Sequence, residues 1–140
     1  MPEARPPGIG ADAAQRYAYV SNFRSGTVTV VRTASRAPVA TVAVGNSPMG
    51  VAVSQAQPRA YVANFAANTV TVIATATNTA VATINVGQGP TAVATSASGD
   101  RVFVANTIDN TVSVIDVAAN AVTQTIAVIT PDNPNARPYA

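Results

Sequence analysis

Three carboxylates in the latter part of the 140-residue sequence, Asp100, Asp109 and Asp116, are the residues best suited to do chemistry. Carboxylate oxygens bind hard cations such as Ca²⁺ and Mg²⁺, and a facing pair can act as general acid and general base. Each of the three, however, falls in or beside a predicted turn, where aspartate is common because its side chain bonds to nearby backbone. We therefore expect solvated loop residues that do not converge on one metal or substrate.

The other groups on which most enzymes rely are missing. The sequence contains no histidine, cysteine, lysine or tryptophan, so no imidazole or amine can activate a serine and no thiol can serve as nucleophile or ligand. The glycine-containing segments 45–50 and 87–89 lead into predicted strands, so no helix N-terminus is available to bind phosphate. The sequence predicts neither catalytic residues nor a metal or cofactor, and hence a protein that is not an enzyme.

An asparagine recurs in every copy, at Asn22, Asn64 and Asn106, with a spacing of 42 residues. Three amides in register could line a binding surface. A residue that recurs in every repeat is more typical of folding, and we expect each asparagine to close a strand by bonding turn backbone. An aromatic residue precedes each asparagine by three positions, and we expect these side chains to pack between successive sheets: Tyr19, Tyr61 and Phe103.

The same 42-residue offset runs through almost the whole chain. It defines three copies at 6–47, 48–89 and 90–131, flanked by an N-terminal tail at 1–5 and a C-terminal tail at 132–140. Copies one and two are identical at 20 of 42 positions, and copies two and three at 18 of 42. The copies align without gaps, and so high an identity does not arise by chance. A period near 40 residues is typical of solenoids and propellers.

Each copy contains four short β-branched runs separated by Gly, Pro, Asn, Ser or Asp, a pattern that predicts four strands. The third run of copy two alternates Thr69 and Thr71 with Val70 and Val72, as expected for a sheet covered on both faces. Gly26, Asn68 and Asn110 occupy equivalent places before the third run, where we expect a tight hairpin with positive φ. The sequence thus predicts an all-β chain of three four-stranded antiparallel sheets.

The segments Tyr61-Val62-Ala63-Asn64, Asn68-Thr69-Val70-Thr71-Val72-Ile73 and Val81-Ala82-Thr83-Ile84 closely resemble the YVTN family of β-propeller repeats. The resemblance covers 6–131 and implies that each copy is one propeller blade, so that the chain is a partial propeller. An aspartate that the family often carries after the third strand is kept only at Asp116. Proteins with such repeats are typically microbial and are often exported or displayed on the cell surface, including surface-layer proteins. The resemblance favours an extracytoplasmic location, although residues 1–14 lack the apolar segment of a secretory signal peptide.

These observations favour a non-catalytic repeat module for binding or for structural or surface scaffolding. Two alternatives stay open: a propeller-type enzyme, hydrolase or lyase, and a fragment of a longer propeller. Because propellers close with four to eight blades, we expect self-association or pairing with another propeller segment, and two copies would complete six blades. Nucleic-acid binding is not expected because the eight arginines are scattered, nor membrane insertion because no 18-residue apolar run occurs.

Overall fold

The computed structural model describes residues 8–11 and 16–128, and within them the chain is built from β-strands alone. Twelve strands form three separate four-stranded sheets, and every pair of neighbouring strands is antiparallel and consecutive in sequence. The predicted fold class is therefore confirmed. The expected tails at 1–5 and 132–140, and the outer limits of the first and third copies, lie outside the described residues.

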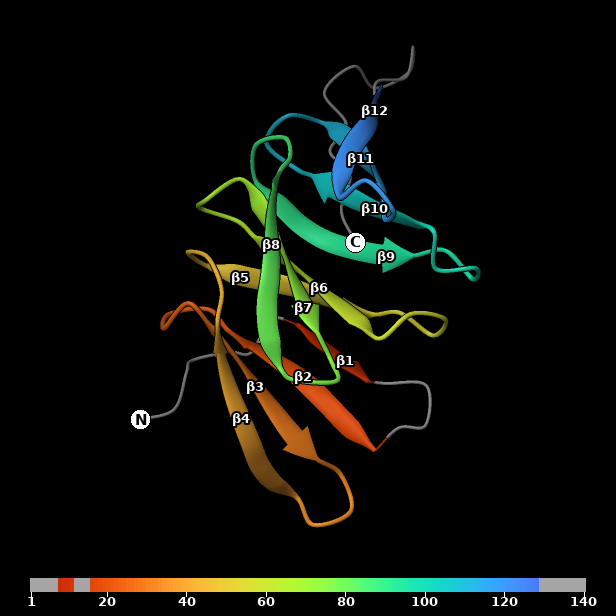
Figure 1. Ribbon diagram of the computed structural model, residues 1–140. Helices are drawn as coiled ribbons and strands as arrows, with labels where there is room; N and C mark the ends of the chain where they lie inside the picture. The colour runs from red at the N-terminus through yellow and green to blue at the C-terminus, as the bar shows by residue number, and fades with distance from the viewer. Residues whose placement is uncertain (1–7, 12–15, 129–140) are drawn as a thin grey trace.

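We call the three sheets blades 1, 2 and 3 in chain order (Figure 1). Blade 1 consists of β1 (Ile9–Ala11), β2 (Tyr17–Asn22), β3 (Thr27–Arg32) and β4 (Ala37–Ala43). Blade 2 consists of β5 (Pro48–Val53), β6 (Arg59–Asn64), β7 (Thr69–Ala74) and β8 (Thr79–Asn85). Blade 3 consists of β9 (Pro90–Thr95), β10 (Arg101–Asn106), β11 (Thr111–Asp116) and β12 (Ala121–Ala127).

The hairpin between the second and third strand of each blade has the expected conformation. Gly26, Asn68 and Asn110 have φ of 67°, 58° and 56°, in the left-handed region that glycine and asparagine tolerate best. In blade 2 the backbone N–H of Asn68 donates to the carbonyl of Asn64 at 3.0 Å and closes the turn. The turn residues therefore set the register of the two central strands in each repeat.

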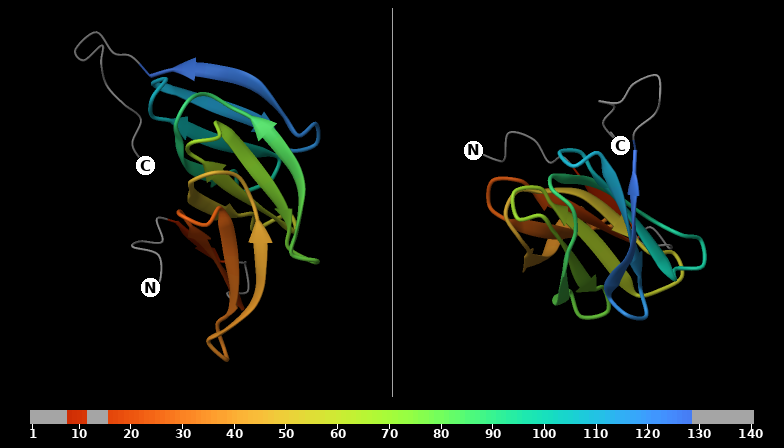
Figure 2. Two further views of the ribbon diagram at one scale, coloured as in Figure 1. Left: turned by 90° about the vertical axis from the view of Figure 1, so that its left-hand side faces the viewer. Right: turned by 90° about the horizontal axis from the view of Figure 1, so that it is seen from above.

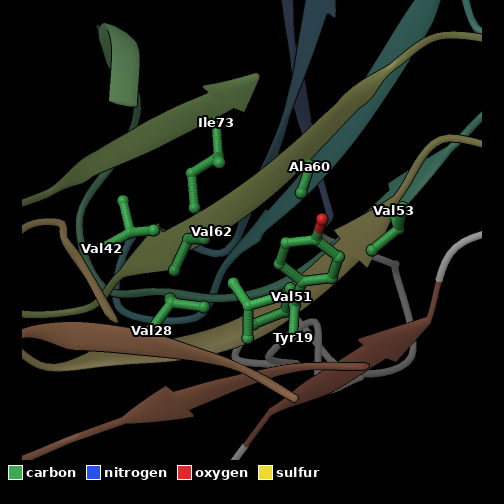
Figure 3. Close-up of a cluster of buried hydrophobic side chains, with 9 residues drawn as sticks. Tyr19, Val28, Val42, Val51, Val53, Ala60, Val62 and Ile73 are labelled. Carbon is green, nitrogen blue, oxygen red and sulfur yellow. The ribbon is translucent and has the colours of Figure 1, made fainter. Parts of the chain in front are cut away.

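The blades stack face to face, so that a sheet of one repeat covers the sheet of the repeat before it (Figures 1 and 2). The first strands β1, β5 and β9 lie next to one another along the stack. Between the blades lie two apolar clusters. The cluster between blades 1 and 2 (Figure 3) contains Tyr19, Val28, Val30, Val42, Val51, Val53, Ala60, Val62 and Ile73. The cluster between blades 2 and 3 contains Tyr61, Val70, Val72, Ile84, Val102, Val104 and Ile115.

Alternation along the strands explains why one blade can serve both clusters. In β6, Val62 faces blade 1 while Tyr61 faces blade 3, because successive side chains of a strand point to opposite faces of the sheet. In β7 the valines at 70 and 72 belong to the cluster with blade 3, and Thr71 is buried on the other face. The central sheet is thus covered on both sides, as its alternating Thr/Val pattern predicted.

The first strands approach so closely that a side chain does not fit at Gly50. A Cβ atom there would lie 2.7 Å from the carbonyl oxygen of Thr91 and 2.8 Å from the Cα of Ala92, both in β9. Gly8, the equivalent residue of blade 1, faces the backbone of Met49 in the same way. Glycine at this position lets the inner edge of one blade contact the backbone of the next.

Candidate functional site

Asn64, the motif asparagine of blade 2, is fully buried and forms three hydrogen bonds. Its amide nitrogen donates to Thr69 Oγ1 at 3.1 Å and to Thr71 Oγ1 at 2.9 Å, both on the neighbouring strand β7. Its carbonyl oxygen accepts the backbone N–H of Gly45 at 3.2 Å, from the segment that links blade 1 to blade 2. The side chain therefore joins two strands of its own blade and ties that blade to the link before it.

The asparagines of the other two blades repeat the cross-strand bonds. The amide nitrogen of Asn22 donates to Thr27 Oγ1 and Thr29 Oγ1, and that of Asn106 to Thr111 Oγ1 and Ser113 Oγ. These partners differ from the turn backbone that we expected. The physical reason is register: Asn64 is paired with Thr69, and since Thr71 lies on the same face two residues further on, one amide group reaches both hydroxyls.

The three motif aromatics are not equivalent in their surroundings. Tyr19 and Tyr61 are buried, each against the blade that comes after its own, whereas Phe103 in blade 3 is partly exposed. The hydroxyl of Tyr19 donates to Asn78 Oδ1 at 3.3 Å, but that of Tyr61 is buried and has no hydrogen-bond partner among the described residues. Burial raises the pKa of Tyr61 above its ordinary value, and nearby Arg59 opposes that effect. Two of the three rings, those of Tyr19 and Tyr61, therefore pack between blades.

The three aspartates each bond to a loop near them. Asp100 Oδ1 accepts hydrogen bonds from Ser98 Oγ at 2.6 Å and Ser96 Oγ at 3.1 Å, in the loop between β9 and β10. These bonds, first that from Ser98, hold the pKa of Asp100 below its ordinary value. Asp109 Oδ2 accepts the backbone N–H of Gln88 at 2.8 Å, and Asp116 Oδ1 that of Ala118 at 3.0 Å.

The aspartates are also placed at different parts of blade 3. Asp116 pairs with the first residue of β10, whereas Asp109 lies in the hairpin after the last residue of that strand. Among the described residues, no group of three or more His, Cys, Asp and Glu side chains could hold a metal ion. The described chain likewise contains no helix long and apolar enough to cross a membrane.

Sequence reasoning missed a polar pocket between blades 1 and 2. Its volume is about 450 Å³, and Arg16, Arg32 and Asn78 line it together with Tyr17. The guanidinium carbon of Arg32 lies 5.6 Å from the centre of the Tyr17 ring, within cation–π range. The sequence contains one signal for this pocket, which is that its two arginines are specific to copy one. The equivalent positions in copy two are Pro58 and Ala74.

A second pocket lies on blade 3 and is almost wholly apolar. It has a volume of about 260 Å³ and is lined by β9, β10 and β11 through Val93, Phe103, Ala105 and Val112. The equivalent surfaces of blades 1 and 2 are filled by the next blade along the chain. This pocket therefore lies on a blade face that no following blade covers within the described chain.

No family model and no curated protein matches the sequence. Among solved structures, the chain is similar to hydrazine synthase of Kuenenia stuttgartiensis, with a TM-score of 0.84 and 23% sequence identity. The match covers 95% of this chain and 42% of that protein, so the chain spans less than half of its neighbour's length. At this identity the likeness shows the fold alone, which is that of a β-propeller.

Proposed function

We propose that the chain is a non-catalytic β-propeller repeat module that serves as a binding or structural scaffold. The observation that carries this proposal is the hydrogen bonding of the asparagines that recur in every repeat. Asn64 and Asn106 are fully buried and donate to hydroxyls of the neighbouring strand. Amide groups committed to bonds within their own blade are not presented to a ligand, so the repeated motif supports folding rather than a shared site.

The carboxylates support the same proposal. Asp100, Asp109 and Asp116 accept hydrogen bonds from their own loops or from the adjacent link, as aspartates in turns commonly do. General acid–base catalysis requires groups that face one substrate atom or one water, and hydrolytic metal sites require several ligands together. The first strands that would line a propeller funnel, 9–11, 48–53 and 90–95, contribute no acidic side chain.

The motifs suggest a setting for such a scaffold. The Tyr61-Val62-Ala63-Asn64 core and its equivalents resemble the YVTN repeats, whose proteins are often exported or displayed on cell surfaces. We therefore propose an extracytoplasmic or surface-associated role, with self-association or pairing with another propeller segment in place of a nucleic-acid or membrane partner. The scattered arginines give no continuous basic stripe, which is in keeping with this choice of partner.

Metal analysis combined with an activity screen tests the non-catalytic role. The purified protein, dialysed against chelator and then against buffer with trace divalent metals, should retain less than one equivalent of any transition metal. It should show no hydrolytic or redox activity above that of a heat-denatured sample. One tightly bound equivalent, together with an activity that is lost in Asp109→Asn or Asp116→Asn but kept in the matched surface variant Gln57→Asn, would overturn the proposal.

A further inference from the structure

The outward face of blade 3 has the composition of a buried face but is not buried. Tyr61 and Ile84 of blade 2 are 0% and 5% exposed, because blade 3 covers them. Their equivalents in blade 3, Phe103 and Ile126, are 39% and 48% exposed. Val112, equivalent to the fully buried Val70, is also partly exposed. Within the described part of the chain, nothing occupies the position that the next blade takes in the other two repeats.

The outward face of blade 1 is also apolar and only partly covered. Val51, Val62 and Ile73 form the face with which blade 2 contacts blade 1, and all three are buried. The residues of blade 1 at the same repeat positions are Ile9, Val20 and Val31. Ile9 is 68% exposed, and the two valines are only partly buried. This face of blade 1 therefore has the same residue types as the face of blade 2 that packs against Tyr19.

We infer that the face of blade 3 around Phe103, Val112 and Ile126 binds the face of blade 1 around Ile9, Val20 and Val31 in a second copy of this chain. The contact continues the two blade interfaces that the chain already contains, with the same residue types on both sides. The inference rests on the proposed scaffold function and identifies its partner.

The distribution of charge favours the same head-to-tail order. The copy at 6–47 carries four arginines and one aspartate, and the copy at 48–89 one arginine; the copy at 90–131 carries one arginine and three aspartates. Their net charges are therefore +3, +1 and −2. A head-to-tail contact brings the most positive copy against the negative one, whereas contacts between like ends bring equal charges together. Such complementarity favours encounter and orientation more than affinity.

The loops at one end of the junction illustrate this complementarity. In the described pair of blades 1 and 2, the hairpin at Arg24 lies beside the hairpin at Ala66, since both line one surface pocket. In the proposed contact, blade 3 takes the place of blade 1 and blade 1 of the second copy takes the place of blade 2. The β10–β11 hairpin, which contains Asp109, then lies beside the hairpin that contains Arg24 of the second copy. A hairpin that carries an aspartate and a hairpin that carries an arginine are thus neighbours at the rim of the proposed interface.

Head-to-tail contacts build a closed ring only when the number of blades suits a propeller. Propellers typically contain four to eight blades, so two copies give a ring of six, whereas three copies give nine. Both junctions of the two-copy ring are the same contact, which leaves no outward apolar face exposed. The expected particle has twice the mass of the 14.1 kDa chain.

One residue departs from the repeat pattern at the proposed junction. Gly8 and Gly50 allow close approach of the next first strand, but the equivalent residue of blade 3 is Ala92. Its methyl group keeps the first strands of the two copies further apart than they are within one chain. The second, third and fourth strands therefore carry most of the contact, and Ala92→Gly should tighten it.

Light scattering coupled to size exclusion at micromolar concentration tests the inference on the full 140-residue chain. The unchanged protein should elute as one species of about 28 kDa, twice the mass of one chain. Phe103→Arg and Val20→Arg should each shift the mass to that of a monomer. The control Val81→Arg changes an exposed valine of the central blade and should remain dimeric. Circular dichroism on every variant establishes that it is folded before its mass is interpreted.

Mixing the two monomeric variants distinguishes head-to-tail contact from other arrangements. The mixture retains one intact blade 3 face on the Val20→Arg copy and one intact blade 1 face on the Phe103→Arg copy, so heterodimers should form while neither variant dimerises alone. A folded monomer of about 14 kDa for the unchanged chain, polydisperse aggregate, or a dimer lost in Phe103→Arg but kept in Val20→Arg would each overturn the inference. None of these results bears on the metal and activity test of the scaffold function.

Discussion

Replacing the motif asparagine of the central blade, Asn64→Ala, removes three hydrogen bonds of a fully buried side chain in one step. The lost bonds are those from the amide nitrogen to Thr69 and Thr71, and the one that the carbonyl oxygen accepts from the N–H of Gly45. Because Asn64 and its acceptor Thr71 are both buried, water does not readily replace the lost amide group at that bond.

The size of the effect can be worked out from these bonds. A neutral hydrogen bond contributes about 1 kcal/mol net. The loss of three bonds should therefore cost about 2 to 3 kcal/mol, because water can donate in place of the amide only to the hydroxyl oxygen of the partly exposed Thr69. Asp109→Ala is the matched comparison. Its carboxylate is exposed and accepts one backbone bond from Gln88, so its replacement should cost less than about 1 kcal/mol.

Urea denaturation followed by circular dichroism, at one fixed protein concentration, measures both changes. The midpoint of Asn64→Ala should fall clearly below that of Asp109→Ala, with the slope of the transition unchanged. Equal midpoints for the two variants would refute the reasoning, because they would mean that the buried amide contributes no more than a solvated loop carboxylate. Asn106→Ala should fall between them, since its carbonyl oxygen is already without a partner among the described residues.

Three further predictions concern individual contacts. Tyr61→Phe should leave the melting temperature unchanged or raise it, because it removes a buried hydroxyl that lacks a hydrogen bond in the described chain. It should also abolish a decline in stability above about pH 10, where the unfolded chain loses a phenol proton that the folded chain retains. An unchanged dependence of stability on alkaline pH would contradict this prediction. Gly50→Val should lower stability by about 1 to 3 kcal/mol in urea melts because its side chain would overlap the backbone of Thr91, and a neutral result would show that the first strands lie further apart. Asp100→Asn should lower stability at neutral pH, because the lowered pKa means that the carboxylate stabilises the fold fully above its ordinary pKa. That effect is lost as the pH falls through the lowered value, so the difference between the variant and the unchanged protein should shrink progressively below about pH 4. A difference of constant size over that range would argue against the Ser98 and Ser96 bonds.

The strands and turns could be predicted from the sequence because local chemistry determines them. Alternating Thr and Val in 69–72 predicts a strand covered on both faces, and Gly26, Asn68 and Asn110 predict positive φ irrespective of what surrounds them. The 42-residue period then extends each local prediction to three equivalent blades. In this chain the fold is therefore the part that a single sequence specifies well.

The partners of individual side chains depend on features that one strand does not contain. The amide of Asn64 bonds to Thr69 and Thr71 because of the β6–β7 register, which fixes contacts across strands rather than along them. The exposure of Phe103 depends on whether another sheet packs onto blade 3, although its sequence context matches that of the buried Tyr61. Periodicity alone predicts the same environment for both, and the two surroundings differ for a reason outside the repeat.

The central claim is that the repeated asparagines close the blades and do not form a binding surface. Hydrogen exchange of side-chain amides, measured by NMR on the protein labelled with the heavy nitrogen isotope, tests it most directly. The amide protons of Asn64 and Asn106 are buried and bonded, so they should exchange far more slowly than those of the exposed Asn85 and Asn120. Exchange of Asn64 and Asn106 at the rate of the exposed asparagines would contradict the claim.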